Sequence, residues 1–289
     1  MYDDILLPFD GSEGAAAALH HTAEIAHWAD ATIHVLFAAD TTRDSVTVVE
    51  NQVVDALVEE GEEIVDEAAE TLRTLGADYE TDVVQGNPAP TIVEYADRYG
   101  HDLIVMPTHA RSGVSRYLVG SVTEKVVRLA SVPVLTARMR PDEQLRFPYE
   151  DILLPTDGSP GAAHAADHGL DLAAALDATV HALSVVDEPA FGMDVRSTAF
   201  AEESEDAATE AVENVESWAE TAGVTDVVRH VEHGKPIEKI LAAIDEHGID
   251  AVVMGTTGRQ GTDRILLGSV AEKTVRSAPV PVITVRREE

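Results

Sequence analysis

The chain has 289 residues, enough for one large domain or two ordinary ones, and 45% of them are apolar, as in a globular core. Asp and Glu number 53 against 20 Lys and Arg, which gives a formal net charge of −33. This charge argues against nucleic acid or an anionic membrane as a partner, and a sequence without cysteine excludes disulfides and thiolate metal sites.

The strong acidity indicates a halophile's cytoplasm. Like charges on a compact chain repel one another, and salt screens that repulsion. The first residues, MYDDILLPFD, lack the positive region of a signal peptide, and no apolar run approaches the length of a membrane span. We therefore expect a cytoplasmic protein adapted to high salt.

Short apolar runs typical of buried strands alternate with helical stretches along the first half of the chain. The predicted strands are Ile5–Pro8, Ile33–Phe37, Tyr79–Val84, Leu103–Met106 and Val134–Ala137, and the predicted helices are residues 12–28, 50–75, 89–99 and 121–130. A polar segment with two prolines, RMRPDEQLRFPY, follows and is typical of a linker.

The second half repeats the first. DDILLPFDGS at Asp3 returns as EDILLPTDGS at Glu150, and GSVTEKVVRLASVPVLTAR returns as GSVAEKTVRSAPVPVITVR. The predicted strands of this half are residues 151–155, 179–185, 227–232, 250–254 and 281–285, and its helices are 160–176, 201–222, 236–247 and 269–277. One long period indicates two duplicated domains, 1–138 and 150–289, joined by a linker at 139–149.

The alternation predicts an α/β fold. Continuous apolar strands separated by amphipathic helices are typical of a parallel sheet with helices on both faces, and right-handed crossovers make each domain doubly wound. Ligands of such sheets bind beyond the carboxyl ends of the strands. In this chain those ends carry an Asp after the first strand of each repeat and a glycine-rich stretch after the fourth.

The stretch GTTGRQGTDRILLGSV, from Gly255 to Val270, has the features of a phosphate site. Glycines permit positive φ and close approach of N–H groups, and Gly268-Ser269 opens a helix whose N-terminus attracts anions. Residues 255–276 hold four basic and two acidic residues, a local net charge of +2. A surface loop that merely opens a helix is the alternative, and Glu272 and Arg276 are spaced to pair with each other at i, i+4.

The pattern Gly-x2-Gly-x9-Gly-Ser after the fourth strand, with Asp in LLPTDGS after the first, resembles the universal stress protein family, here as a tandem protein of halophilic archaeal type. The resemblance covers nearly the whole chain. It implies two domains of the adenine nucleotide α-hydrolase-like class, each with a five-stranded parallel sheet, and ATP binding with Mg²⁺ or Mn²⁺ and little or no hydrolysis. It also implies pairing through the last strand, as an intrachain pseudo-dimer and then a homodimer.

The resemblance places the nucleotide in the second repeat. It implies that Pro155, Thr156 and Asp157 line the adenine and ribose side and that Val185 contacts adenine. It implies contacts to ribose and phosphates from the remaining positions, which are Met254, Gly255, Gly258, Arg259, Gly268, Ser269 and Val270. An alternative role for Asp157 is to cap the helix that follows it.

The first repeat departs from this pattern. Phe9 stands where the second repeat has Thr156, and Pro107 and Ala110 stand at the places of Gly255 and Gly258. Proline has no N–H to donate, so we expect a weaker site here. Its remaining candidates are Asp10, Gly120, Ser121 and Val122.

The function that this reading favours is ATP binding with a regulatory or stress-protective role, held mainly in the second domain. No Ser/His/Asp nucleophile set stands out, so no catalytic residue is predicted. The alternatives are a scaffold that needs no nucleotide and a weak ATPase or adenylyl-transfer enzyme.

Overall fold

The computed structural model describes residues 1–40, 52–107, 120–138, 145–187, 197–258 and 267–287. Within these ranges the chain divides into two compact units, Met1–Phe147 and Pro148–Glu289. None of the described helices is both long enough and apolar enough to span a membrane.

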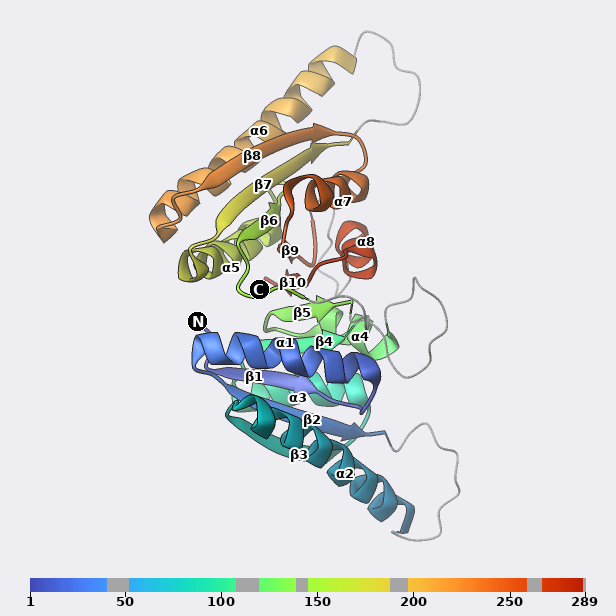
Figure 1. The fold of residues 1–289 in the computed structure, drawn as a ribbon. Coiled ribbons are helices and arrows are strands. Elements are labelled where there is room, and N and C mark those ends of the chain that lie inside the picture. The colour runs from blue at the N-terminus through green and yellow to red at the C-terminus, as the bar shows by residue number, and fades with distance from the viewer. Residues whose placement is uncertain (41–51, 108–119, 139–144, 188–196, 259–266, 288–289) are drawn as a thin grey trace. The chain divides into compact units, whose positions relative to one another are not determined.

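Unit 1 is a parallel sheet between two pairs of helices (Figure 1). Its strands run in the order β3-β2-β1-β4-β5. In chain order the elements are β1 (Asp4–Pro8), α1 (Glu13–Ala29), β2 (Thr32–Ala39), α2 (Gln52–Leu75), β3 (Tyr79–Gln85), α3 (Pro88–Tyr99), β4 (Leu103–Pro107), α4 (Ser121–Leu129) and β5 (Val134–Ala137).

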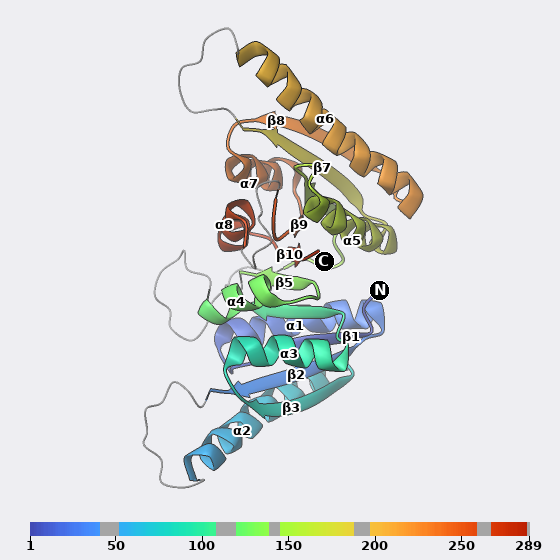
Figure 2. The same cartoon turned by 180° about the vertical axis from the view of Figure 1, so that it is seen from behind.

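Unit 2 repeats this arrangement, with the strand order β8-β7-β6-β9-β10. Its elements are β6 (Asp151–Pro155), α5 (Pro160–Leu176), β7 (Thr179–Val186), α6 (Ser197–Ala222), β8 (Val227–His233), α7 (Pro236–His247), β9 (Ala251–Gly255), α8 (Ser269–Ser277) and β10 (Val282–Val285). Helices α5 and α6 pack together, as do α7 and α8, and Figure 2 shows the two pairs on opposite sides of the sheet.

The predicted fold class is confirmed, since the pairings of β1, β2, β4 and their unit 2 counterparts are parallel. Central strands are buried on both faces, and Ile5, Leu6 and Leu7 of β1 have no exposed surface. The outer strand β3 exposes residues along its length. Continuous apolar runs in the sequence therefore correctly predicted the central strands of each sheet.

Two sequence expectations differ from the structure in detail. Helix α6 begins at Ser197, four residues before the predicted start at 201. Phe147 lies in the segment predicted to be a linker, yet its ring packs edge-on against Trp28 and His21 of α1, at centroid distances of 5.7 and 6.1 Å. An aromatic side chain in a polar segment thus anchors the end of that segment to unit 1.

The topology predicts where a ligand would bind in each unit. The chain leaves β1 toward one side and β4 toward the other, so a ligand crevice is expected beyond the carboxyl ends of these two neighbouring strands. The corresponding strands of unit 2 are β6 and β9. The predicted glycine-rich stretch begins at the end of β9.

Candidate functional site at the carboxyl ends of β6 and β9

The turn after β6 is held by its own polar groups. Thr156 donates its N–H to Leu183 O on β7 at 2.8 Å, and its hydroxyl accepts the N–H of Gly158 at 3.2 Å. Gly158 has φ 73°, a conformation that favours glycine. The turn therefore fixes Thr156 and Asp157 at the start of the crevice.

Asp157 has the local role that its position before a helix allows. Its Oδ1 accepts the N–H of Ser159 at 3.0 Å, and Ser159 in turn caps α5 by accepting the N–H of Ala162 at 3.2 Å. The carboxylate is thus held by the turn, with Oδ2 facing the loop that follows β9.

Gly258 lies directly on that carboxylate. A Cβ at Gly258 would stand 2.6 Å from Asp157 Oδ2, closer than any real contact. Gly258 therefore supplies space rather than a left-handed backbone, because φ is not positive at Gly255, Gly258 or Gly268. The sequence argument from positive φ was wrong at these three positions.

Gly255 allows a second close approach, to the first turn of α5. A Cβ at Gly255 would lie 2.8 Å from Gly161 O, and a Cβ at Gly161 would lie 2.7 Å from Thr257 O. The sequence analysis missed Gly161 and Thr257. Glycine is a poor helix former, so its presence in the first turn of α5 was a signal of close packing.

The glycine-rich stretch closes on itself at Gly268. Its N–H donates to Thr256 O at 2.7 Å, which brings the start of α8 against the end of β9. The first hydrogen bond of α8 runs from Glu272 N to Gly268 O at 2.9 Å. The amides of Ser269 and Val270 precede that bond, so they have no acceptor within the helix and can meet an anion.

The remaining candidates of unit 2 lie around this crevice. Pro155 ends β6 and is half-buried, whereas Met254 in β9 is only 6% exposed, so its side chain belongs mainly to the core. Val185 is half-buried near the carboxyl end of β7. Arg259 lies outside the described residues.

The positive charge of α8 is partly neutralised within the helix. Arg276 donates through Nη2 to Glu272 Oε1 at 2.7 Å, so the i, i+4 pairing that the sequence allowed is confirmed. Lys273 lies on an exposed position of the same helix. Among the described residues of this stretch, Lys273 and the helix N-terminus therefore attract an anion more than Arg276 does.

Unit 1 keeps the same turn but a different strand end. Asp10 Oδ1 accepts the N–H of Ser12 at 3.0 Å, and Gly11 has φ 70°. Phe9, at the place of Thr156, is buried and brings no hydroxyl. The scaffold of the turn is therefore common to both units, whereas its polar lining is not.

The start of α4 also matches that of α8. Gly120 precedes the helix, Ser121 begins it and Val122 follows, with the first bond from Glu124 N to Gly120 O at 2.9 Å. Pro107 O accepts the hydroxyl of Thr123 at 2.9 Å, a bond that Ala271 cannot make in unit 2. Ala110 lies outside the described residues.

Both halves of the chain are similar to proteins of one family. The model of the Universal stress protein family matches residues 1–138 and again 148–286. A universal stress protein of Methanocaldococcus jannaschii is 36% identical over 157 residues, which cover 53% of this chain and 90% of that protein.

Solved structures show the same likeness in three dimensions. The crystal structure of a universal stress protein from Archaeoglobus fulgidus DSM 4304 matches with a TM-score of 0.75 and 25% identity, over 99% of this chain and 98% of that one. A structure from Pseudomonas aeruginosa UCBPP-PA14 matches with a TM-score of 0.66 and 20% identity, over 99% and 93%, and supports the fold alone. Because both halves match the family, the chain belongs to the universal stress protein family, with one family domain in each unit.

Proposed function

We propose that the chain is an ATP-binding regulatory or stress-protective protein whose nucleotide lies in unit 2, in the crevice beyond β6 and β9. The main support for this proposal is that the glycine-rich stretch packs against the turn before α5 and leads into the start of α8. Gly258 rests on Asp157, and Gly268 is bonded to Thr256, so the amides at the start of α8 border the same crevice as the turn after β6.

The chemistry of this crevice suits a nucleotide triphosphate. Free amides at a helix N-terminus attract phosphate oxygens, and the exposed hydroxyl of Ser269 adds a donor. Lys273 adds positive charge one turn later. A divalent ion, Mg²⁺ or Mn²⁺, would enter with the phosphates, because such ions take phosphate oxygens as ligands.

Unit 1 would bind nucleotide more weakly. Pro107 has no N–H to offer at the strand end, and the buried ring of Phe9 replaces a hydroxyl. A hydrogen bond to a charged group contributes roughly 1.5–3 kcal/mol, so the loss of one such bond weakens a site by about one to two powers of ten.

Paired variants test the location. Gly258→Ala with Ser269→Ala places a Cβ on Asp157 Oδ2 and removes a donor, so tight ATP binding in equilibrium dialysis should be lost. The matched control, Gly120→Ala with Ser121→Ala, changes the corresponding positions of unit 1 and should leave tight binding nearly intact. Loss of tight binding in the unit 1 variant alone would contradict the proposal.

Two other functions make different predictions for the same protein. A scaffold that needs no nucleotide would show no ATP binding in dialysis and unchanged partners in the variants. A weak ATPase or adenylyl-transfer enzyme would release ADP or AMP from bound ATP, whereas the proposed binding protein retains ATP. Mass spectrometry of ligand released from the purified chain distinguishes the three.

We also propose that the units pair through their last strands as an intrachain pseudo-dimer and that two chains pair again. Each last strand stands at the end of its own unit's strand order, and VPVLTAR and VPVITVR give both an apolar sequence. Small-angle X-ray scattering tests this pairing. A profile of two beads on an extended linker would rule it out.

A further inference from the structure

Three histidines of unit 2 form a stack at the end of the sheet opposite the proposed nucleotide site. His181 of β7, His230 of β8 and His247 of α7 have ring centroids 5.3, 5.4 and 4.5 Å apart. They come from three elements, so the imidazole stack (His181, His230 and His247) joins the last turn of α7 to two neighbouring strands.

Hydrogen bonds limit how many protons the stack can hold. His181 Nε2 lies 2.9 Å from Asp151 Oδ1, and His181 Nδ1 lies 3.1 Å from His230 Nε2. One proton serves the bond between the two rings, whichever nitrogen carries it. If both rings become imidazolium ions, two N–H donors face each other at that distance, and the bond is lost.

The carboxylates near the stack would stabilise a charged His181 more than a charged His230. Asp151 of β6 faces His181, and Glu232 of β8 faces His230, but Lys239 of α7 already binds Glu232 at 3.0 Å. Asp250, which precedes β9, accepts the amides of Glu150 and Asp151 with its Oδ2. Burial lowers the pKa of His230, and His247 and His181 lower it further.

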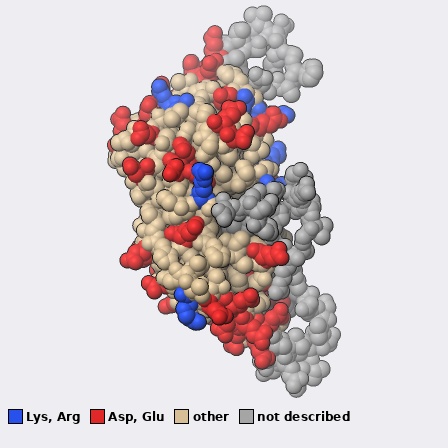
Figure 3. Space-filling view, in the orientation of Figure 1, with Lys and Arg blue, Asp and Glu red and all other residues tan. Residues whose placement is uncertain are grey.

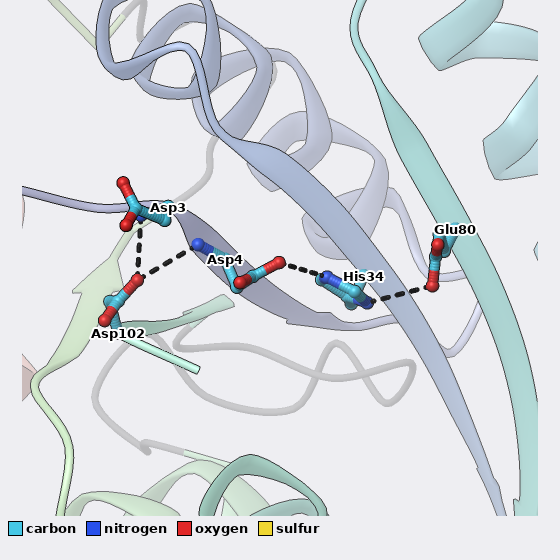
Figure 4. Close-up of polar contacts among 5 residues, drawn as sticks. All are labelled: Asp3, Asp4, His34, Glu80 and Asp102. Atoms are coloured by element: carbon cyan, nitrogen blue, oxygen red, sulfur yellow. Dashed lines mark hydrogen bonds and ion pairs between the residues drawn. The ribbon is translucent and has the colours of Figure 1, made fainter. Parts of the chain in front are cut away.

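Unit 1 carries opposite chemistry at the corresponding places. His34 lies between two carboxylates, at 2.7 Å from Asp4 Oδ1 and 3.6 Å from Glu80 Oε2 (Figure 4). The strand register places Asp82 where unit 2 has His230, since Leu36 pairs with Asp82 as Leu183 pairs with His230.

The last residue of the third helix differs in the same sense. Tyr99 ends α3, whereas His247 ends α7. Unit 1 therefore has a carboxylate and a phenol where unit 2 has two imidazoles. The two units form an internal comparison within one chain.

We propose that the imidazole stack is an acid-sensitive clasp that releases the last turn of α7 from β7 and β8 when the pH falls below that of a neutral cytoplasm. Unit 1 lacks the three-ring stack. Its His101, which follows α3, lies edge-on to His34 with ring centroids 4.6 Å apart, and both ring nitrogens of His101 are buried without a hydrogen-bond partner among the described residues. Burial and His34 lower the pKa of His101, so α3 also responds to acid, but no ring-to-ring hydrogen bond of His101 is lost there. The response is independent of the proposed nucleotide site.

The direction of the effect follows from proton linkage. His230 in the closed unit has a lowered pKa, so the open form binds more protons below the ordinary value of 6.5. Stability that is fully present above pH 6.5 is then lost as the pH falls. One proton taken up on opening changes the opening equilibrium by at most about tenfold per pH unit.

Hydrogen exchange on the full chain tests the clasp. Protection factors for amides of α7, Pro236–His247, are compared with those of α3, Pro88–Tyr99, between pH 7.5 and 5.0 at constant high KCl. We expect α7 to lose more protection than α3, by up to about thirty-fold, because protonation breaks the ring-to-ring hydrogen bond of the stack, whereas His101 has no such bond to lose. Equal losses in the two helices would overturn the proposal.

Two variants exchange the chemistry of unit 2 for that of unit 1. His230→Asp introduces the carboxylate that Asp82 has in unit 1. His247→Tyr keeps an aromatic ring at an exposed position, so this variant tests the clasp even if His230→Asp does not fold. Each should remove most of the extra loss in α7. A loss that persists unchanged in His247→Tyr contradicts the clasp, and His20→Gln, an exposed histidine in α1, is the control.

Discussion

At the scale of single residues, Gly169 determines how closely α5 lies on its sheet. A Cβ at this position would stand 2.4 Å from Leu154 Cδ2 and 3.2 Å from Val253 Cβ. We expect Gly169→Ala to lower the free energy of unfolding by about 1–3 kcal/mol, because the added methyl overpacks a full core. Urea unfolding measures it, with the exposed Asp171→Ala on the same helix as the control. A stabilised Gly169→Ala protein would contradict this packing.

A buried histidine on α1 and a half-buried one on α5 make a pH-dependent contribution to stability. Burial lowers the pKa of His21 to about 4, and burial followed by His164 lowers the pKa of His168 to about 4. A histidine that stays neutral in the folded state supports folding above pH 6.5, and this support is lost as the pH falls toward 4.

His21→Gln should therefore reduce the loss of stability on acidification. The lowered pKa of His21 corresponds to about 2–3 kcal/mol between pH 7 and pH 4.5. Urea unfolding at both pH values measures the difference between wild type and variant. An unchanged pH dependence would show that His21 takes up its proton without cost. Because His21 and His168 occupy corresponding positions, they affect both units alike and leave the α7-to-α3 comparison intact.

The sequence predicted the glycines of the site but not their physical role. Gly255 and Gly258 were identified from spacing, yet they matter because Gly161 O and Asp157 Oδ2 stand where a Cβ would be. Such contacts join residues about a hundred positions apart, and no local pattern encodes them. The sequence did not predict the histidine stack for the same reason, because its three residues come from three elements.

At the scale of elements, one carboxylate fastens the start of each central strand. Asp102 Oδ2 accepts the amides of Asp3 at 2.8 Å and Asp4 at 3.0 Å, as Figure 4 shows. Asp250 binds Glu150 and Asp151 in the same way, at 2.8 and 3.2 Å. The two bonds align β1 with β4, and β6 with β9, next to the turn where the strands begin.

Asp102→Ala should remove both bonds and lower the free energy of unfolding by about 2–3 kcal/mol, since hydrogen bonds to charged groups are the stronger class. Asp102→Asn keeps an acceptor and should cost less. Thermal unfolding measures both, with the exposed Glu94→Ala of α3 as the control. Equal midpoints for the three proteins would show that the carboxylate does not align the strands.

Element positions were the most predictable feature of the chain. The strand Val134–Ala137 was found to the residue, because all four residues are buried and three of them are apolar. Helix α6 was placed four residues late, at 201 instead of Ser197. Helix α1, predicted as residues 12–28, runs from Glu13 to Ala29, and Ser12 caps it.

At the scale of the whole molecule, charge is the dominant property. Asp and Glu form several patches on the visible surface of both units, and Lys and Arg are fewer there (Figure 3). The formal net charge of −33 makes the folded chain repel itself.

Thermal unfolding should therefore depend on salt. The Debye length falls from about 10 Å at 0.1 M to about 3 Å at 1 M, so the unfolding midpoint should rise with KCl over this range. An equally concentrated uncharged osmolyte controls for solvent effects. A flat or falling midpoint would contradict the prediction that the chain is adapted to high salt.

The number of ATP molecules that the native chain binds tests the central proposal most directly. Isothermal calorimetry with Mg²⁺ in high KCl should give one tight site per chain, because only unit 2 has Gly255 and Gly258 where unit 1 has Pro107 and Ala110. A chelator should weaken that site, since the ion enters with the phosphates. Two equal sites, or no binding at all, would contradict a nucleotide held mainly in unit 2.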